Sequence, residues 1–548
     1  MLASAALLIQ YRSGLNFMLD DWAFVIYRED GDLGDFFDPH NEHISILPVA
    51  IYKLFLSLFG MESAMPLQVF SVLVFLLSVF VLFLYLKPLV GTPTAVIGCA
   101  VILFLGAAWE DLLWAFQIGF SISMAAGVGS LIMLRRGDAL GDRVACLLLV
   151  VAMISTSLGI PFMIGAALLL LLQRENLTRR LYVVVVPLAV YGAWYLGWGQ
   201  TAESALSFGN VLNAPEYIAR SFSLTVTEVT GLSRVVKSTA TVPSLLVGLL
   251  AVVAIAIGVK RQAGIPRLLL VAGVIALAFW GLAALNTAPG RGFEASRYQF
   301  PNAVFMLMIL ASAFEGTRPR TKELVVLALI AVVAVAVNLE AMRSGYTNVM
   351  KPLSDKGITG LTAIGIARET VEPGLEIGMN QDDTAKVTAG AYFAAEDKYG
   401  SPVWSESEIA ESSGFARTRI DQILVAALPI SARAMPNALV SGSCRQVQAG
   451  VPGSAEAVPL PERRFSIRSE REVFLAVGRY SDGVTTGAAL VEPDVETLLR
   501  IPRDLSDKPW RVGFFGEGEV RVCTSVKQRR PGSAEIRTGD AKGDQSLR

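Results

Sequence analysis

The chain has 548 residues, of which 53% are hydrophobic and 17% are charged, and its formal net charge is -1. A soluble domain carries about 25% charged residues, so this composition and a mean hydropathy of +0.51 exclude a wholly soluble protein. The balanced charge gives no sign of nucleic-acid binding. Residues 1–340 contain long apolar runs, whereas residues 345–548 contain most of the charged side chains. The sequence therefore predicts a polytopic α-helical membrane region followed by a soluble region.

Apolar runs long enough to cross a bilayer of about 30 Å, alone or as paired shorter helices, recur along the first region. They are 66–87, 93–108, 113–134, 144–155, 158–172, 181–199, 243–259, 267–285, 299–315 and 323–339. The opening stretch Met1–Gln10 is an additional apolar run, although a helix rising about 1.5 Å per residue would cover only half a membrane there. It lacks the basic leader and cleavage pattern of a signal peptide. We therefore predict about eleven transmembrane helices.

Basic residues in alternate loops predict the orientation. These loops carry Lys87; Arg135, Arg136 and Arg143; Arg174, Arg179 and Arg180; Lys260, Arg261 and Arg267; and Arg318, Arg320 and Lys322. The positive-inside rule makes their side cytoplasmic. The first long loop, residues 11–65, and the C-terminal region are then predicted on the non-cytoplasmic side.

Within the first long loop, the segment Ile44–Gly60 is apolar but contains Pro48 and Lys53. A spanning helix at this point would invert all later loops against the charge rule. We therefore predict a helix that lies in the membrane interface.

The segment Leu19–His43, in the same loop, is rich in acids and contains both histidines of the chain. Its acids are Asp20, Asp21, Glu29, Asp30, Asp32, Asp35, Asp38 and Glu42, against a single base, Arg28. Asp20 and Asp21 directly follow the first apolar segment. A partly desolvated carboxylate at that height can take a proton from a substrate hydroxyl, which makes both acids candidate catalytic residues. A solvated acidic loop is the alternative explanation.

The run from Asp38 to His43 places His40 and His43 three residues apart, with Glu42 between them. These three side chains are candidate substrate contacts, and a structural hydrogen-bonding role for the histidines is the alternative. Two histidines with Asp38 or Glu42 form only a weak metal motif, because structural and catalytic metal sites need three or four ligands. The sequence therefore predicts no metal site and no certain cofactor, and leaves a divalent cation open.

A late outer loop, residues 289–298, places Arg291, Arg297 and Tyr298 just before a predicted span. Guanidinium groups at the height of the lipid headgroups can bind a phosphate bidentately, and ordinary headgroup anchoring is the alternative. A second cluster lies on the same predicted side and contains Trp109, Glu110, Asp111, Trp114 and Gln117. For that cluster, an interfacial aromatic belt is the default explanation.

The C-terminal region divides into three predicted parts. Residues 341–440 are mainly helical, with amphipathic stretches such as Ile409–Leu428. Residues 441–526 contain short alternating segments between turn residues, which predict a small β-sandwich. Residues 527–548 are polar and are predicted to be a disordered tail. Cys444 and Cys523 are the candidate disulfide of this region if it lies outside the cytoplasm.

The order of these features resembles the GT-C class of membrane glycosyltransferases, which includes protein O-mannosyltransferases and lipid A aminoarabinose transferases. The resemblance covers about residues 1–340: a first helix, an acidic pair in a long outer loop with an interface helix, many spans, and a late arginine loop. It implies that Asp20 is the general base. The second acid of that class is usually Glu, whereas this chain has Asp21. Arg291 or Arg297 would hold the lipid phosphate. The C-terminal region resembles extensions of actinobacterial transferases of this type.

The resemblance implies transfer, with inversion, from a polyprenyl-phosphate sugar donor to a glycan, lipid or protein acceptor at the membrane. Two other functions remain open at this point. One is a flippase or exporter of lipid-linked glycans, although the charges gather in loops rather than inside the spans, where a transporter needs them. The other is a non-enzymatic assembly protein of the cell envelope.

Overall fold

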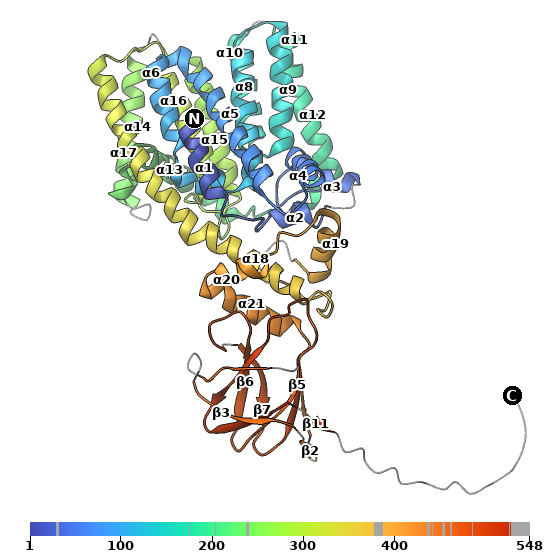
Figure 1. Cartoon of the computed structure of the whole chain (residues 1–548). Helices are drawn as coiled ribbons and strands as arrows, with labels where there is room; N and C mark the ends of the chain where they lie inside the picture. The colour runs from blue at the N-terminus through green and yellow to red at the C-terminus, as the bar shows by residue number, and fades with distance from the viewer. Residues whose placement is uncertain are drawn as a thin grey trace, which may run out of the picture. The chain divides into compact units, whose positions relative to one another are not determined.

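The computed structural model describes residues 1–28, 32–174, 176–202, 204–236, 241–262, 264–377, 387–435, 439–440, 442–451, 455–460, 463–484, 486–524 and 526–527 (Figure 1). Contacts divide the chain into two compact units. Unit 1 comprises Met1–Gly357, Gly378–Val387 and Ala391–Pro402, and unit 2 comprises Ile358–Ile377, Thr388–Gly390 and Val403–Arg548.

The predicted helical region 341–440 is thus shared between the two units rather than forming a domain of its own. The reason is local: the helix that begins at Lys351 runs on to Ile366 and crosses the boundary between the units without a break. Of the predicted tail, Lys527 belongs to a short strand, and residues 528–548 lie outside the described residues.

Unit 1 is helical. Its main helices are α1 (Leu2–Arg12), α2 (Asp21–Val25), α3 (Leu33–Phe37), α4 (Ile46–Phe59), α5 (Met65–Val90), α6 (Thr92–Leu103), α7 (Trp109–Leu113), α8 (Ile118–Leu134), α9 (Ala139–Ser155), α10 (Gly159–Gln173), α11 (Leu177–Arg180), α12 (Tyr182–Gly197), α13 (Phe208–Thr230), α14 (Thr241–Lys260), α15 (Arg267–Leu285), α16 (Ser296–Ala313) and α17 (Thr321–Gly345). After α17 the chain continues through a π-helical turn, Tyr346–Met350, into α18 (Lys351–Ile366), and α19 (Ala389–Tyr399) follows.

Within the described residues, six helices are long and apolar enough to cross a membrane: Met65–Val90, Ala115–Leu134, Leu177–Gly197, Val242–Lys260, Arg267–Leu285 and Thr321–Ile366. A seventh span results if the bent pair Thr92–Leu103 and Gly106–Leu113 is counted as one. The chain is therefore a multi-pass membrane protein. Each predicted run contains a helix. Not all of the described helices are long and apolar enough to count as spans, so the number of eleven spans stays a prediction. The orientation also stays a prediction.

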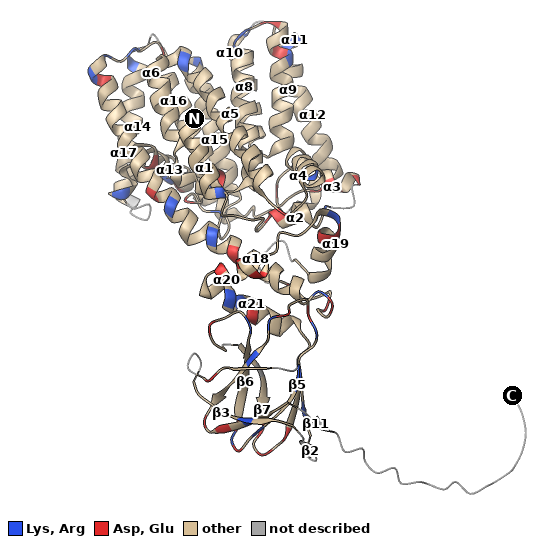
Figure 2. Ribbon diagram, viewed as in Figure 1, with Lys and Arg blue, Asp and Glu red and all other residues tan. Residues whose placement is uncertain are grey.

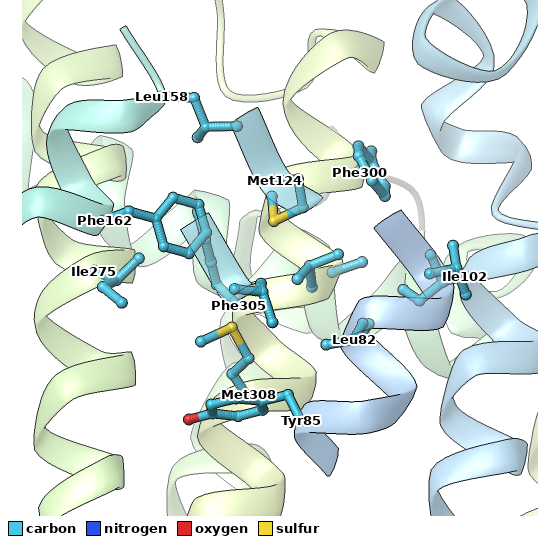
Figure 3. Close-up of a cluster of buried hydrophobic side chains, with 14 of the residues drawn as sticks. Leu82, Tyr85, Ile102, Met124, Leu158, Phe162, Ile275, Phe300, Phe305 and Met308 are labelled. Atoms are coloured by element: carbon cyan, nitrogen blue, oxygen red, sulfur yellow. The ribbon is translucent and has the colours of Figure 1, made fainter. Parts of the chain in front are cut away.

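Small residues allow the helices of the apolar core to pack closely. Figure 3 shows large side chains of that core, among them Phe162, Ile275 and Phe305. A β-carbon built on Gly165 of α10 would lie 2.4 Å from the Ile275 side chain of α15, and one on Gly127 of α8 would lie 2.2 Å from Phe162. The ring of Phe162 in turn contacts that of Phe305 on α16, with centroids 5.7 Å apart. In a membrane the hydrophobic effect does not drive helices together, because lipid is as apolar as their side chains. Helices there usually associate through close contact at small residues such as glycine.

Helix α13 lies between the predicted runs 181–199 and 243–259, in a stretch where the sequence predicted no transmembrane helix. Thr225 and Thr227, in its second half, are buried, and their hydroxyls donate to carbonyls four residues earlier. That bonding satisfies the polar groups within the helix. The sequence did contain signals for its ends: the Ser207 side chain accepts from the Asn210 backbone as an N-cap, and Gly231 follows the last turn in the left-handed conformation.

The apolar segment of the first loop forms α4, as predicted, although its place in the membrane interface is untested. One side of α4 is buried, including Val49, Tyr52 and Leu56, whereas Leu54 and Leu58 are exposed. A helix with one buried and one exposed apolar side is the pattern expected of an interfacial helix.

Unit 2 contains α20 (Glu406–Glu411), α21 (Gly414–Ala427) and two main sheets. Its strands are β1 (Ser431–Ala434), β2 (Leu439–Val440), β3 (Cys444–Gln448), β4 (Val458–Pro459), β5 (Arg464–Ser469), β6 (Val473–Gly478), β7 (Thr486–Val491), β8 (Thr497–Arg500), β9 (Arg511–Gly516), β10 (Glu519–Cys523) and β11 (Val526–Lys527). Five strands form a sheet in the order β1-β8-β5-β10-β3, and four form a sheet in the order β4-β9-β6-β7. Each sheet buries alternate apolar residues, such as Phe465 and Leu475, which fits the predicted small sandwich.

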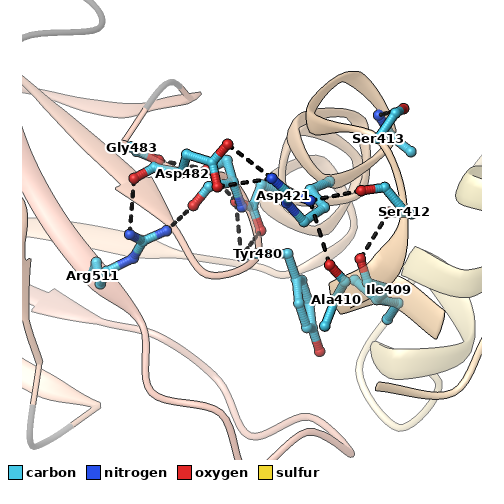
Figure 4. Close-up of polar contacts among 12 residues, drawn as sticks. Ile409, Ala410, Ser412, Ser413, Asp421, Tyr480, Asp482, Gly483 and Arg511 are labelled. Atoms are coloured by element: carbon cyan, nitrogen blue, oxygen red, sulfur yellow. Dashed lines mark hydrogen bonds and ion pairs between the residues drawn. The ribbon is translucent and has the colours of Figure 1, made fainter. Parts of the chain in front are cut away.

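A buried carboxylate ties α21 to the turn after β6 (Figure 4). Asp421 accepts hydrogen bonds from the backbone N–H groups of Arg479, Tyr480 and Ser481 and from the Ser481 hydroxyl. Four donors compensate a carboxylate for the loss of water on burial. Asp421 therefore fixes helix and sheet together within unit 2.

Candidate functional site

A turn at Leu19, just before α2, places the acidic pair. Leu19 has a φ of +50°, an uncommon conformation for a residue with a side chain, and α2 begins immediately afterwards. Asp20 is the N-cap residue of α2, and Asp21 is its first helical residue. Successive residues of a helix point in directions about 100° apart, so the two carboxylates have different surroundings.

Asp21 is buried, with 3% of its surface exposed, and its oxygens are occupied. The backbone N–H of Met18 donates to Oδ2 at 2.9 Å, and the indole N–H of Trp114 donates to the same atom at 3.0 Å. The Tyr52 hydroxyl donates to Oδ1. Burial raises the pKa of Asp21 to about 6, although these hydrogen bonds act in the opposite direction.

The two histidines lie on either side of a tight turn. The backbones of His40 and His43 pair in both directions, with N–H to carbonyl distances of 3.0 and 2.9 Å. Asn41, within the turn, has a φ of +52°, which asparagine tolerates better than most residues. The spacing that looked like a weak metal motif is therefore the geometry of a closed turn.

His40 extends from this turn to Asp20. Its Nε2 atom lies 3.5 Å from Oδ2 of Asp20, and no hydrogen bond to Nε2 is found among the described residues. The ring of His40 packs edge-on against the rings of Phe24 and Phe116, with centroids 5.3 and 5.1 Å away. The Asp20 side chain keeps 27% of its surface exposed, against 11% for His40. Asp20 is thus the accessible acid of the pair, and an imidazole is fixed beside it.

Glu42 and His43 connect the turn to the late arginine loop. Glu42 Oε2 accepts from Nη1 of Arg291 at 2.7 Å, and its other oxygen lies 3.6 Å from Nε2 of His43. Nδ1 of His43 lies 2.9 Å from the hydroxyl of Ser157. Burial lowers the pKa of His43, against the effect of Glu42, so His43 is neutral near pH 7.

Arg297 lies at the start of α16 and pairs with Glu110 of α7. Its Nη1 atom lies 3.5 Å from Glu110 Oε2, and its backbone N–H donates to the same oxygen at 3.1 Å. Nη2 donates to the Gly290 carbonyl at 2.7 Å, and the guanidinium lies over the ring of Tyr298, 5.5 Å from its centroid. These contacts fix the orientation of the Arg297 guanidinium, and the Arg297 side chain stays partly exposed.

The predicted site residues converge on one place, because Arg297 also interacts electrostatically with Asp20, and Tyr298 with Glu42 and Arg291. The resulting cluster is made of Asp20, His40, Glu42, His43, Glu110, Arg291, Arg297 and Tyr298, and we call it the acid–arginine cluster. Asp20 is the N-cap residue of α2, the residues from His40 to His43 form the histidine turn, and Glu110 lies in α7. Arg291 lies in the loop before α16, and Arg297 and Tyr298 lie in the first turn of α16.

For Glu110 and Trp114, the default explanation from the sequence was an interfacial aromatic belt. Glu110 instead pairs with Arg297, and Trp114 holds Asp21. Tyr52, which also holds Asp21, gave no signal in the sequence beyond its place in α4. One feature of the sequence could have indicated that Glu110 is more than part of an aromatic belt. Its carboxylate directly follows Trp109 at the start of a helix.

Unit 1 contains a cavity of about 460 Å³. Its lining includes Trp109, the sequence neighbour of Glu110, and Glu294 and Gln299, which stand on either side of Arg297 in the sequence, but no member of the acid–arginine cluster. The side-chain oxygen of Gln299 is buried and lacks a hydrogen-bond partner within the described residues.

In the part of the chain that the structure describes, no three His, Cys, Asp or Glu side chains are grouped as ligands of a metal ion. The disulfide candidate lies in unit 2, apart from this cluster in the sequence, and the structure joins Cys444 to Cys523 across β3 and β10.

No protein-family model matches the chain, and no curated protein is similar to it in sequence. Among solved structures, the chain is similar to the crystal structure of ArnT from Cupriavidus metallidurans bound to undecaprenyl phosphate, with 16% sequence identity and a TM-score of 0.40. The match covers 68% of this chain and 81% of that chain.

Proposed function

We propose that the protein is a membrane glycosyltransferase that moves a sugar from a polyprenyl-phosphate donor to a hydroxyl acceptor, with Asp20 as the general base. The observation that carries this proposal is the contrast between two adjacent acids. Asp21 is buried and its oxygens accept from three donors, whereas Asp20 is partly exposed beside His40 and within electrostatic reach of Arg297. Only Asp20 is placed to meet a substrate, and Asp21 is a positioning residue that holds α2.

In the proposed reaction, the acceptor oxygen forms a bond to the anomeric carbon of the donor while the bond from that carbon to the phosphate oxygen breaks. The acceptor proton passes to Asp20, and the electron pair of the broken bond leaves on the polyprenyl phosphate. A single displacement of this kind inverts the anomeric configuration. No nucleotide enters the step, so the reaction suits the non-cytoplasmic face that the positive-inside rule predicts for this loop.

Arg297 is the stronger candidate for the group that receives the leaving phosphate. Its guanidinium is oriented by Glu110, Gly290 and Tyr298 but keeps a 3.5 Å ion pair rather than a short one. Arg291, in contrast, makes a 2.7 Å bond to Glu42. A phosphate can replace a long ion pair more readily than a short one, because less interaction energy is lost. Arg291 and Glu42 then hold the histidine turn in place, with His43 neutral.

His40 is proposed to orient Asp20 and, when the carboxylate has taken the acceptor proton, to accept a hydrogen bond from it. An imidazole next to Asp20 also destabilises the negative charge of the Asp20 carboxylate less than a second carboxylate in the same place would. The acceptor is a glycan, lipid or protein at the cell envelope.

The test is transfer by the purified full-length protein in lipid nanodiscs, given a panel of polyprenyl-phosphate sugars with a hydroxyl acceptor. Release of polyprenyl phosphate is followed by mass spectrometry. Release by the wild-type protein, and its loss in an Asp20→Asn variant, would support the proposal. Release that is equal in both proteins, or none with any donor while the protein moves lipid-linked sugars across the bilayer, would refute it in favour of a flippase.

A further inference from the structure

The outward face of the five-stranded sheet in unit 2 is rich in arginine. Side chains of a strand point alternately to the two faces of its sheet, and Phe465, Leu499 and Val520 are buried on the inner face. The residues between them, together with their partners across the strands, form the outer face. Five arginines belong to it: Arg433 on β1, Arg464 and Arg468 on β5, Arg500 on β8 and Arg521 on β10. Figure 2 marks basic positions of this sheet in blue.

The strand register places arginines opposite arginines. Arg464 of β5 is the direct partner of Arg500 on β8, and Arg468 of β5 is the direct partner of Arg521 on β10. Directly opposed residues of an antiparallel pair lie about 4.5–5.5 Å apart, and like charges at that distance destabilise the sheet. Arg433 is diagonal to Arg500, since its own partner is Leu498, and diagonal positions of a sheet lie about 7–8 Å apart. The pairing of arginine with arginine therefore does not itself stabilise the sheet.

Only part of this charge is compensated. Arg521 pairs with Glu496 at 3.1 Å, and Arg468 lies 3.7 Å from Asp494. Arg433, Arg464 and Arg500 have no ion pair with a carboxylate within the described ranges, and all three are exposed. We call these three residues the basic triad. A cluster of unpaired cations on a flat exposed sheet is the arrangement that attracts an anionic partner.

We propose that this face binds an anionic polysaccharide, with the basic triad contacting its carboxylate or phosphate groups. The choice of a polysaccharide rests on the proposed glycosyltransferase function, whereas the anionic character rests on the arginines alone. Arg464 and Arg468 are four residues apart on β5, a separation of about 13 Å, so the two opposed pairs can hold successive charged units of one chain. Gln446 and Gln448, on the same face of β3, offer amides for hydroxyl groups.

Other anionic partners fit this face less well. A surface that docks on lipid inserts exposed aromatic or aliphatic side chains beside its bases, but the exposed large hydrophobic residues of unit 2 lie elsewhere, at Phe415, Val451, Phe474, Leu490 and Leu505. A single-stranded nucleic acid would need aromatic side chains on which its bases stack, and the strand positions of this face contain none. An extended chain of charged sugars needs neither.

The test compares binding of the full-length protein in nanodiscs to immobilised polygalacturonate, with neutral dextran as the control polymer. The variant is Arg464→Gln with Arg500→Gln. The matched control is Arg445→Gln with Arg471→Gln, which removes the same charge from exposed residues of unit 2 that pair with Glu456 and Glu517. We expect the triad variant to bind polygalacturonate at least about tenfold more weakly, the loss of a charge-assisted contact. The control variant should bind like the wild type.

The melting temperature of unit 2 separates binding from structure. If the arginines serve a ligand, the triad variant melts at the same temperature as the wild type or higher, because a repulsive pair has been removed. The inference fails if the wild type binds dextran as well as polygalacturonate, if both variants bind alike, if the triad variant melts lower, or if only anionic vesicles or DNA are bound. Polygalacturonate binding should survive Asp20→Asn, so loss of transfer activity alone leaves this inference standing.

Discussion

The Nε2 atom of His40 lies 3.5 Å from Oδ2 of Asp20. His40 itself belongs to the tight turn in which its backbone pairs with that of His43. The contact pairs a partly exposed carboxylate with an imidazole that packs against two phenylalanine rings. Asp21, the next residue, is shielded from this chemistry by its burial and its three donors.

Asp20→Asn should reduce the turnover number by about 10²- to 10⁴-fold, the usual contribution of a general base. The amide keeps the shape of the side chain but cannot take a proton, so donor binding should stay unchanged. Asp32→Asn is the matched control, because Asp32 caps α3 and asparagine caps equally well. Turnover is measured as polyprenyl phosphate released per enzyme in nanodiscs. A control variant as slow as Asp20→Asn would point to the charge of the loop rather than to Asp20.

His40→Gln should lower the turnover number by about tenfold while leaving the Michaelis constant for the donor nearly unchanged, since a positioning residue acts on the base and not on the donor. The glutamine amide can still form a hydrogen bond with Asp20, but it lacks the ring that packs against Phe24 and Phe116. Initial rates at varied donor concentration give both constants. An increased Michaelis constant with unchanged turnover would instead make His40 a direct donor contact.

Arg297→Ala should weaken donor binding by about 1.5–3 kcal/mol, the contribution of a hydrogen bond to a charged group. Arg291→Ala should have a smaller effect on the donor, because this arginine is already bonded to Glu42. Arg297→Lys is the informative control, as it keeps the charge but loses the planar fork. Affinity is measured by titration with a non-transferable donor analogue. Unchanged affinity in both single variants and the double variant would remove the arginines from the site.

Asp21 should make thermal stability depend on pH. Its pKa is about 6 in the folded protein and about 3.9 in an unfolded chain, so the folded state binds the extra proton between these values. The contribution of Asp21 to stability should therefore be fully present below about pH 4, fall as the pH rises through 6, and then level off. Asp21→Asn should remove this part of the profile. The melting temperature, measured in detergent from pH 4 to 8, is the readout, and identical profiles for both proteins would contradict the assignment.

Reduction of the Cys444–Cys523 bond should destabilise unit 2 by about 2–4 kcal/mol, because the link closes a long loop, with a sequence separation of 79. Replacement of both cysteines with serine should give the same loss. Cys99→Ser is the control, since Cys99 is a free cysteine. Unfolding is followed by intrinsic fluorescence with and without reductant. Equal stability of the double variant and the wild type would show that the pair is not linked in the purified protein.

The sequence by itself determined the features that depend on local pattern. The apolar runs give α5, α6, α8, α9, α10, α12 and α14 to α17, because a helix in lipid must satisfy its backbone hydrogen bonds within itself, and alternation gives the strands of unit 2. The acidic loop, the histidines and the late arginines were also recognisable as a group, since charged residues between apolar runs are confined to loops. Helix α13 was not predicted, and the bonds of its hydroxyls to carbonyls four residues earlier make them compatible with burial.

Only the tertiary structure decided what each charged residue does. Asp20 and Asp21 are equivalent in the sequence, but a rotation of about 100° along α2 leaves one exposed and turns the other toward Tyr52 and Trp114. Glu110 meets Arg297 across 187 positions of the chain, a distance over which no local pattern carries information. Likewise, the opposed arginines of β5, β8 and β10 follow from strand register, which is fixed by the pairing of whole strands around a buried core.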